Sequence, residues 1–149
     1  MNVITPGALA LTLALATGPA HADLVRVPSQ KSVTETADAL VAAVEGAGAT
    51  LFARVDHGKG AASVGLEMPE AQLIVFGNPQ LGTPAMQDAI EAGLVLPLRV
   101  LVHDDGQGGS VLVYEEPGER LEEVGGDDDA DYVSKMEAAL RKLTAAASE

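Results

Sequence analysis

Two clusters of histidine and aspartate in this 149-residue sequence have side chains suited to metal binding or proton transfer. Asp56-His57 ends one predicted strand, and His103-Asp104-Asp105 ends another. If these strand ends are neighbours, two imidazoles and three carboxylates converge, a donor set that suits Zn²⁺ or Cu²⁺. His57 and His103 are therefore candidate metal ligands. Two alternatives stay open: a polar strand end with local hydrogen bonds, and a general acid or base at His57 oriented by Asp56.

A second segment with binding potential, residues 77–84, follows a predicted strand and opens a predicted helix. Free N–H groups and the positive end of the helix dipole favour an anion at such a place. The spacing is not that of a phosphate-binding loop, so we predict a pocket wall for a small carboxylate or thiol-containing ligand, or simply a rigid turn and helix cap. We expect one pocket between this segment and the end of the earlier strand. Its predicted ligand-binding residues are Asp56, His57, Phe76, Gly77, Asn78, Pro79, Gly82 and Thr83.

The sequence lacks the residues that several other kinds of site require. There is no cysteine, which excludes disulfides, thiolate metal sites and cysteine nucleophiles. Ser63 and Ser110 do not lie in a Gly-x-Ser-x-Gly setting. Asp127, Asp129 and Asp131 have the spacing of a calcium loop, but the sixth and twelfth positions lack the required glycine and glutamate. The sequence identifies no cofactor.

The charge of the chain limits its partners. It carries 22 acidic and nine basic residues, for a net charge of −13. Such a field repels nucleic acid and anionic lipid surfaces and favours cations or basic partners. We predict no nucleic-acid partner; a small ligand or a cation fits this charge, and a homodimer is a further expectation.

The first 22 residues resemble a secretory signal peptide. Residues 7–16 form an apolar stretch of h-region length, too short to span a bilayer as a helix, and Ala20-His21-Ala22 is a small-x-small triplet before the first charged residue, Asp23. Residues 1–6 contain no Lys or Arg, so the basic n-region is either weak or lies upstream of the given start. We predict cleavage after Ala22, a periplasmic or secreted location, and a mature chain of one domain, residues 23–149, without a stable membrane anchor.

The mature chain alternates strand and helix signals. Ser32 and Glu35 form a capping-box pattern at the start of a helix, and the apolar run 72–76 predicts a strand that is central or covered on both faces. The predicted order is β-α-β-β-α-β-β-α: strands at 24–27, 50–56, 72–76, 98–103 and 111–114, helices starting at 32 and spanning 84–92, a glycine-rich connection at 60–65, and a short helical piece before a last helix around 133–143. The fold class is α+β, a mainly antiparallel sheet with helices packed on it.

Five short motifs resemble the bacterial domain-of-unknown-function 302 family. They are Val55-Asp-His57, Gly65-Leu-Glu67, Phe76-Gly-Asn-Pro79, Leu81-Gly-Thr-Pro84 and Leu96-Pro-Leu98-Arg-Val-Leu-Val102, within about residues 33–117. The resemblance implies a compact α+β domain without a settled activity. It does not extend to His103, where family members commonly have an aromatic residue, nor to an arginine-histidine pair where this chain has Glu122-Glu123.

These observations lead to a functional hypothesis with two alternatives. We expect an exported binding or accessory domain that holds a small ligand or metal ion without turnover. The alternatives are an enzyme that uses Asp56-His57 as an acid/base pair, and a structural dimerisation module.

Overall fold

The chain forms one five-stranded sheet. The computed structural model describes residues 24–149, and the predicted signal peptide lies outside them. The spatial order is β1-β5-β4-β3-β2, and every neighbouring pair is antiparallel. The strands are β1 (Leu24–Ser29), β2 (Thr50–Asp56), β3 (Ala71–Gly77), β4 (Leu98–Asp104) and β5 (Ser110–Glu115). The predicted α+β class with an antiparallel sheet is confirmed.

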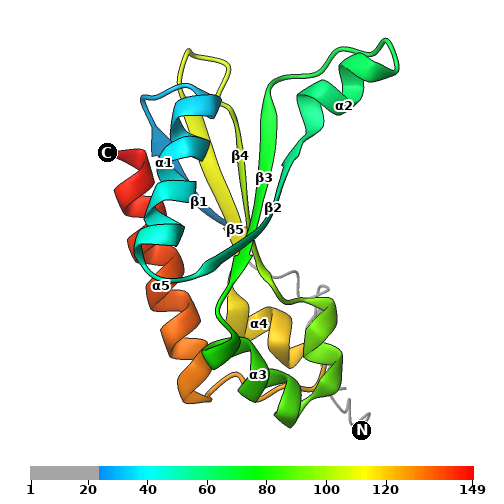
Figure 1. Cartoon of the computed structure of the whole chain (residues 1–149), viewed down its shortest axis with the longest axis vertical. Coiled ribbons are helices and arrows are strands. Elements are labelled where there is room, and N and C mark those ends of the chain that lie inside the picture. The colour runs from blue at the N-terminus through cyan, green and yellow to red at the C-terminus, as the bar shows by residue number, and fades with distance from the viewer. Residues whose placement is uncertain (1–23) are drawn as a thin grey trace, which may run out of the picture.

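The helices lie mainly on one side and at one end of this sheet (Figure 1). They are α1 (Val33–Gly46), α2 (His57–Ser63), α3 (Pro79–Asp88), the 3-10 turn η1 (Ile90–Leu94), α4 (Pro117–Glu122) and α5 (Asp131–Ser148). Helices α1 and α5 pack together against the sheet, α3 and α4 lie at its lower end in the view, and α2 projects from the opposite end. None of these helices is long and apolar enough to cross a membrane.

Two apolar clusters hold these elements together. The larger one joins α1 and α5 to the sheet through fully buried side chains such as Leu40, Ile74 and Leu112. Complete burial of one such side chain contributes about 1.5–3 kcal/mol. The smaller cluster joins α3, η1, α4 and α5 around Met136. Within residues 24–149, these two clusters and the five strands make up one packed unit.

Three local predictions are confirmed. The Ser32 backbone N–H donates to Glu35 Oε2 at 3.0 Å and the Glu35 backbone N–H donates to Ser32 Oγ at 3.3 Å, which completes the capping box of α1. Strand β3 lies inside the sheet, between β2 and β4. Strands β4 and β5 pair in register, from Asp104 opposite Ser110 to Leu101 opposite Val113.

Two helices differ from the prediction. Helix α3 begins at Pro79, not Pro84, because Asn78 acts as its N-cap and accepts a bond from the Gln80 N–H at 2.9 Å. Pro84 therefore lies inside the helix. Helix α2 occupies part of the segment expected to be a connection; its cap is Asp56, whose carboxylate accepts a bond from the Lys59 N–H at 2.9 Å.

Candidate functional site

Strand β3 separates the two segments that we expected to share a pocket. Asp56 lies opposite Gln72 near the start of β3, whereas Gly77, at its end, lies opposite Thr50. Gly77 is five positions after Gln72, and strand residues rise about 3.4 Å each, so the two ends are about 17 Å apart. One small ligand cannot touch both. The structure forms no single pocket between the segments, and each borders a hollow of its own.

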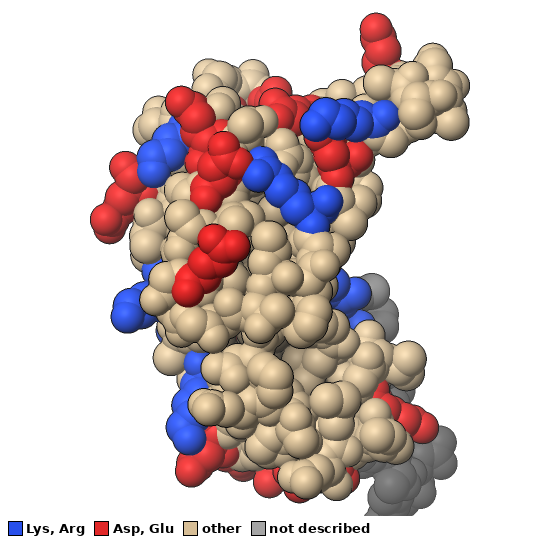
Figure 2. Space-filling view, in the orientation of Figure 1, with Lys and Arg blue, Asp and Glu red and all other residues tan. Residues whose placement is uncertain are grey.

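The first hollow, here called the polar cleft, lies where α1, β2, β3 and α2 meet. Charged side chains of both signs gather at this end of the molecule (Figure 2). The cleft has a volume of about 750 Å³ and is wide open to solvent. Its lining residues are Thr34, Asp38, Arg54, Asp56, Gly58, Lys59, Met68, Glu70 and Gln72.

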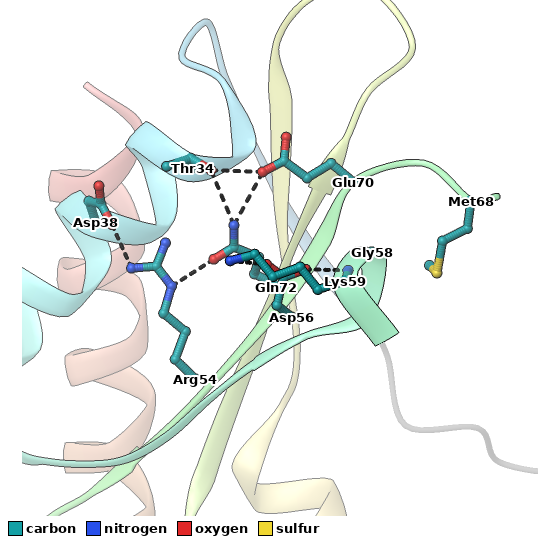
Figure 3. Close-up of a pocket in the computed structure, with 9 residues that line it drawn as sticks. All are labelled: Thr34, Asp38, Arg54, Asp56, Gly58, Lys59, Met68, Glu70 and Gln72. Carbon is teal, nitrogen blue, oxygen red and sulfur yellow. Dashed lines mark hydrogen bonds and ion pairs between the residues drawn. The ribbon is translucent and has the colours of Figure 1, made fainter. Parts of the chain in front are cut away.

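A hydrogen-bond network joins the side chains along the wall of this cleft (Figure 3). Arg54 donates from Nε to Gln72 Oε1 at 2.6 Å and from Nη1 to Asp38 Oδ1 at 2.5 Å. The buried Gln72 amide donates to Thr34 Oγ1 and to Glu70 Oε1, both at 3.2 Å. The polar groups therefore largely satisfy one another, which favours a structural role in fixing α1 to the sheet edge.

The Asp56 carboxylate contacts Lys59 and makes no hydrogen bond to His57. Its Oδ1 accepts the Lys59 backbone N–H, and its Oδ2 lies 3.1 Å from Lys59 Nζ. The backbone hydrogen bond, followed by the other contacts of Lys59, lowers the pKa of the Asp56 carboxyl below its ordinary value. His57 is exposed in the first turn of α2. The expected orientation of His57 by Asp56 has no hydrogen bond to support it.

The two predicted metal ligands, His57 and His103, have strand β3 between them. His57 is the first residue of α2, directly after β2, and His103 is in β4. His103 is opposite Ala71 of β3, and Asp56, next to His57, is opposite Gln72 on the other side. Adjacent strands are about 4.8 Å apart, which places the two backbones roughly 10 Å apart. His103 Nδ1 is 2.7 Å from the Asp104 carbonyl and donates to it. Within residues 24–149, no group of three or more His, Asp and Glu side chains is arranged to hold a metal ion, so this site stays a prediction.

The second hollow, here called the apolar pocket, lies at the other end of β3. It has a volume of about 350 Å³. The end of β3, the first half of α3 and the start of β4 contribute most of its wall. Its lining residues are Phe52, Gly77, Asn78, Pro79, Leu81, Gly82, Thr83, Met86, Gly93, Leu96, Pro97, Leu98 and Met136.

Close packing around Gly77 shapes this pocket. Phe52 lies at an irregularity in the pairing of β2, between Leu51 and Ala53, and stays 56% exposed. A Cβ atom at Gly77 would lie 3.4 Å from both Phe52 Cε2 and Pro97 Cβ. The Phe52 and Pro97 side chains therefore lie at contact distance from the place that a Cβ of residue 77 would take.

Five of the eight predicted ligand-binding residues line the apolar pocket: Gly77, Asn78, Pro79, Gly82 and Thr83. Phe76 does not, because it points into the core under α1 and is 2% exposed. The expected anion site at the helix start is weakened, since the Asn78 side chain already accepts the Gln80 N–H and Pro79 has no N–H.

Several other residues that line the apolar pocket were not among those predicted from the sequence. Leu96, Pro97 and Leu98 stand in one of the motifs that carry the family resemblance, and that signal was available. Phe52 was a weaker signal: an aromatic residue in a chain that is only 3% aromatic. Met86 and Met136 come from helices and could be assigned to the pocket only from the packing of α3 against α5.

Two fluoride-channel proteins are similar to this chain in sequence. Over 94 residues it is 47% identical to the fluoride-specific ion channel FluC 1 of Brucella suis biovar 1 (strain 1330), which covers 63% of this chain and 37% of that protein. The fluoride-specific ion channel FluC 2 of Brucella melitensis biotype 1 (strain ATCC 23456 / CCUG 17765 / NCTC 10094 / 16M) matches with the same identity over 94 residues, 35% of its length. The chain thus spans little more than a third of these relatives.

A solved structure and a family model agree on the fold. The crystal structure of the uncharacterized conserved protein DUF302 from Bacillus stearothermophilus superposes with a TM-score of 0.67 over 84% of this chain and 94% of that one, at 16% identity. The family model described as domain of unknown function DUF302 matches residues 25–148, beyond the 33–117 suggested by the motifs. The chain therefore belongs to the DUF302 family.

Proposed function

We propose that this protein is an exported binding domain that holds a small, largely apolar ligand in the apolar pocket without chemical turnover. The observation that carries the proposal is the pocket itself: a hollow of about 350 Å³ bounded by aliphatic, aromatic and methionine side chains. Small-molecule sites typically enclose about 300–1,000 Å³ and are lined mainly by apolar groups with a few polar ones. Here Asn78 and Thr83 supply the polar groups.

The composition of the wall favours binding over catalysis. None of the residues that line the apolar pocket has an ionisable side chain. General acid–base catalysis requires a titratable group within hydrogen-bond reach of the substrate. His57, the residue of the enzyme alternative, lies at the start of α2, at the opposite end of β3 from this pocket.

A probe and a pocket-filling variant test the proposal. The probe is the uncharged fluorophore N-phenylnaphthylamine, titrated into residues 23–149. Gly82 lies in α3, and a Cβ there would point to Leu96 Cδ1 at 3.8 Å, so a leucine side chain at this position occupies the pocket. Gly82→Leu is expected to weaken probe binding at least tenfold, since about 1.4 kcal/mol of lost contact suffices for that change.

The same substitution elsewhere serves as the control. Gly46 ends α1, and a Cβ at that position meets no atom within 4 Å. Gly46→Leu is expected to leave the affinity for the probe unchanged. Equal affinities in both variants and the parent, with circular dichroism confirming that all three are folded, would refute binding at the apolar pocket.

The relatives favour a second candidate function, an extramembrane accessory domain for a fluoride channel. The matched relatives are named as fluoride-specific ion channels, and residues 24–149 include no helix able to cross a membrane. A pore needs membrane-spanning segments. This chain spans little more than a third of those relatives, so it would correspond to one part of a longer channel protein.

Growth in fluoride tests this second candidate. A strain lacking the gene is expected to stop growing at a lower fluoride concentration than its parent, and to recover when residues 1–149 are supplied from a plasmid. Chloride at equal concentration is the control. Indistinguishable growth of the two strains across the fluoride series would remove this candidate.

A further inference from the structure

Among residues 24–149, no helix lies on one side of the sheet, although most residues on that side are apolar. Side chains alternate along a strand, so the neighbours of the buried Ile74, Val100 and Leu112 point away from α1 and α5. We call this side the open face. Its apolar residues include Val55 of β2, Leu73 and Val75 of β3, Leu101 of β4, and Val111 and Val113 of β5. Val55 is 41% exposed and Val113 is 8% exposed, and the other four are half-buried.

The apolar pattern of these strands is typical of a sheet that is buried on both faces. An antiparallel sheet with one wet face normally alternates apolar and polar residues, whereas strands buried on both faces read as continuous apolar runs. Strands β3 to β5 carry such runs, as in Leu73–Phe76 and Val100–Val102. Leaving the apolar side chains of Leu73 and Leu101, at the centre of this face, in contact with water is unfavourable.

An arm beside the open face is apolar as well. We define the arm as residues 57–70, which include α2 and the loop that leads to β3. Val64, Leu66 and Met68 on this arm are 70%, 66% and 46% exposed, and α2 buries none of its residues. The arm leans to the side away from α1 and α5, and the molecular surface is hollowed between it and the lower helices (Figures 1 and 2).

The sheet part of the open face carries little of the negative charge that keeps two copies of this chain apart. With a net charge of −13, two copies repel each other wherever their carboxylates meet. Among the described strand residues that point to the open face, Glu115 is the acidic one, and it is paired with Arg99 at 3.2 Å and Arg120 at 3.4 Å. Arg26 and His103 point to the same face. Two copies can therefore bring their sheets together without stacking carboxylates, while Glu67 and Glu70 lie on the arm.

The size of the open face indicates that the arm takes part. Five strands at about 4.8 Å spacing and about 22 Å long give a footprint of roughly 500 Å². A stable interface usually removes about 800 Å² from each partner. The sheet alone falls short of that area, and an arm that lies over the partner's sheet supplies the rest.

We propose that the protein is a two-fold symmetric dimer in which the open faces meet and each arm packs against the other copy. A two-fold contact uses the same patch on both copies, which an apolar sheet face with an arm at one end can satisfy. Sheets that pack face to face leave about 10 Å between them, enough for interdigitated Val and Leu side chains.

Sedimentation equilibrium of residues 23–149 tests this proposal, since those residues contain all five described strands and both described apolar clusters. A dimer is expected at micromolar concentration. Leu73→Lys, which places a charge at the centre of the open face, is expected to raise the dimer dissociation constant at least tenfold. Leu66 on the arm is 66% exposed and belongs to neither apolar cluster, so Leu66→Lys is expected to do so without any effect on folding.

Matched controls decide the outcome. Ala42→Lys places the same charge on the exposed outer side of α1 and should leave the dissociation constant unchanged. A monomer at every concentration of residues 23–149 would overturn the proposal. A dimer equally resistant to Leu73→Lys and Leu66→Lys would do the same, and association seen only with residues 1–149 would assign the face to the first 22 residues instead.

Discussion

At the residue scale, Asp56 caps the arm. Its carboxylate receives the first-turn N–H of α2, a helix that buries none of its own side chains. We expect Asp56→Ala to make the amide hydrogens of α2 exchange several-fold faster, because an alanine cannot accept that bond. Asp56→Asn keeps an N-cap oxygen without the charge, so it should preserve slow exchange. Equal exchange in all three proteins, measured by mass spectrometry of the arm peptide, would show that the cap is not what holds α2.

Glu35 makes a pH-dependent contribution at the start of α1. Its hydrogen bonds from the Ser32 side chain and backbone lower the pKa of the carboxyl below its ordinary value. Because the folded pKa is the lower one, the stabilisation is complete above the ordinary carboxyl pKa of about 4.3 and is lost as pH falls through the lowered pKa. NMR titration of the Glu35 carboxylate should show this low pKa, and Ser32→Ala should raise it. Ser134→Ala, on α5, should leave it in place; a Glu35 titration indifferent to Ser32→Ala would contradict the assignment.

At the element scale, the same substitution at two glycines should have opposite effects. Gly82 lies inside α3 with room for a Cβ, so Gly82→Ala should raise the free energy of unfolding by up to about 1 kcal/mol. Gly109 precedes β5, and a Cβ there would lie 2.5 Å from the Ser29 carbonyl oxygen. Gly109→Ala should therefore lower the free energy of unfolding by about 1–3 kcal/mol. Urea unfolding measures both, and a shift of the same sign in the two variants would contradict the packing described here.

The elements that could be predicted from sequence are those with a strong local signal. The apolar run of β3, the turn between β4 and β5, and the Ser32–Glu35 capping box each depend on neighbouring residues. Helix α2 has no such signal: it contains two glycines and no apolar stripe. Helix α3 has two proline starts, and the first one is used because Asn78 accepts the Gln80 N–H.

The candidate site was harder to predict because it depends on strand direction. Asp56 and Gly77 are each the last residue of a strand, and the ends of two successive strands lie together only when the strands are parallel. Strands β2 and β3 are antiparallel, which sends Asp56 and Gly77 to opposite ends. Residues 77–83 could be found from their motif, whereas Phe52 and Met136 reach the apolar pocket through tertiary packing.

At the scale of the whole molecule, the apolar pocket and the open face are separate surfaces with separate tests. The pocket lies where β3 gives way to α3, and the open face extends over the outward side of the sheet as far as the arm. Gly82→Leu acts on the pocket and Leu73→Lys acts on the open face. A ligand effect lost in the first variant with an intact dimer, and a dimer lost in the second with intact probe binding, would establish that the two surfaces work independently.

Export is the last prediction, and it concerns the bond between Ala22 and Asp23. Strand β1 begins at Leu24, so cleavage there would leave all five described strands in the mature chain. Mass spectrometry of the protein from its native host is expected to find a mature chain that starts at Asp23, outside the cytoplasm. Ala22→Leu, which replaces the small residue before the cut, should accumulate the uncleaved precursor, whereas Ala47→Leu in the mature domain should not. Recovery of intact Met1 from the cytoplasm would overturn both the cleavage and the location, because a signal peptide that directs export is removed from the mature protein.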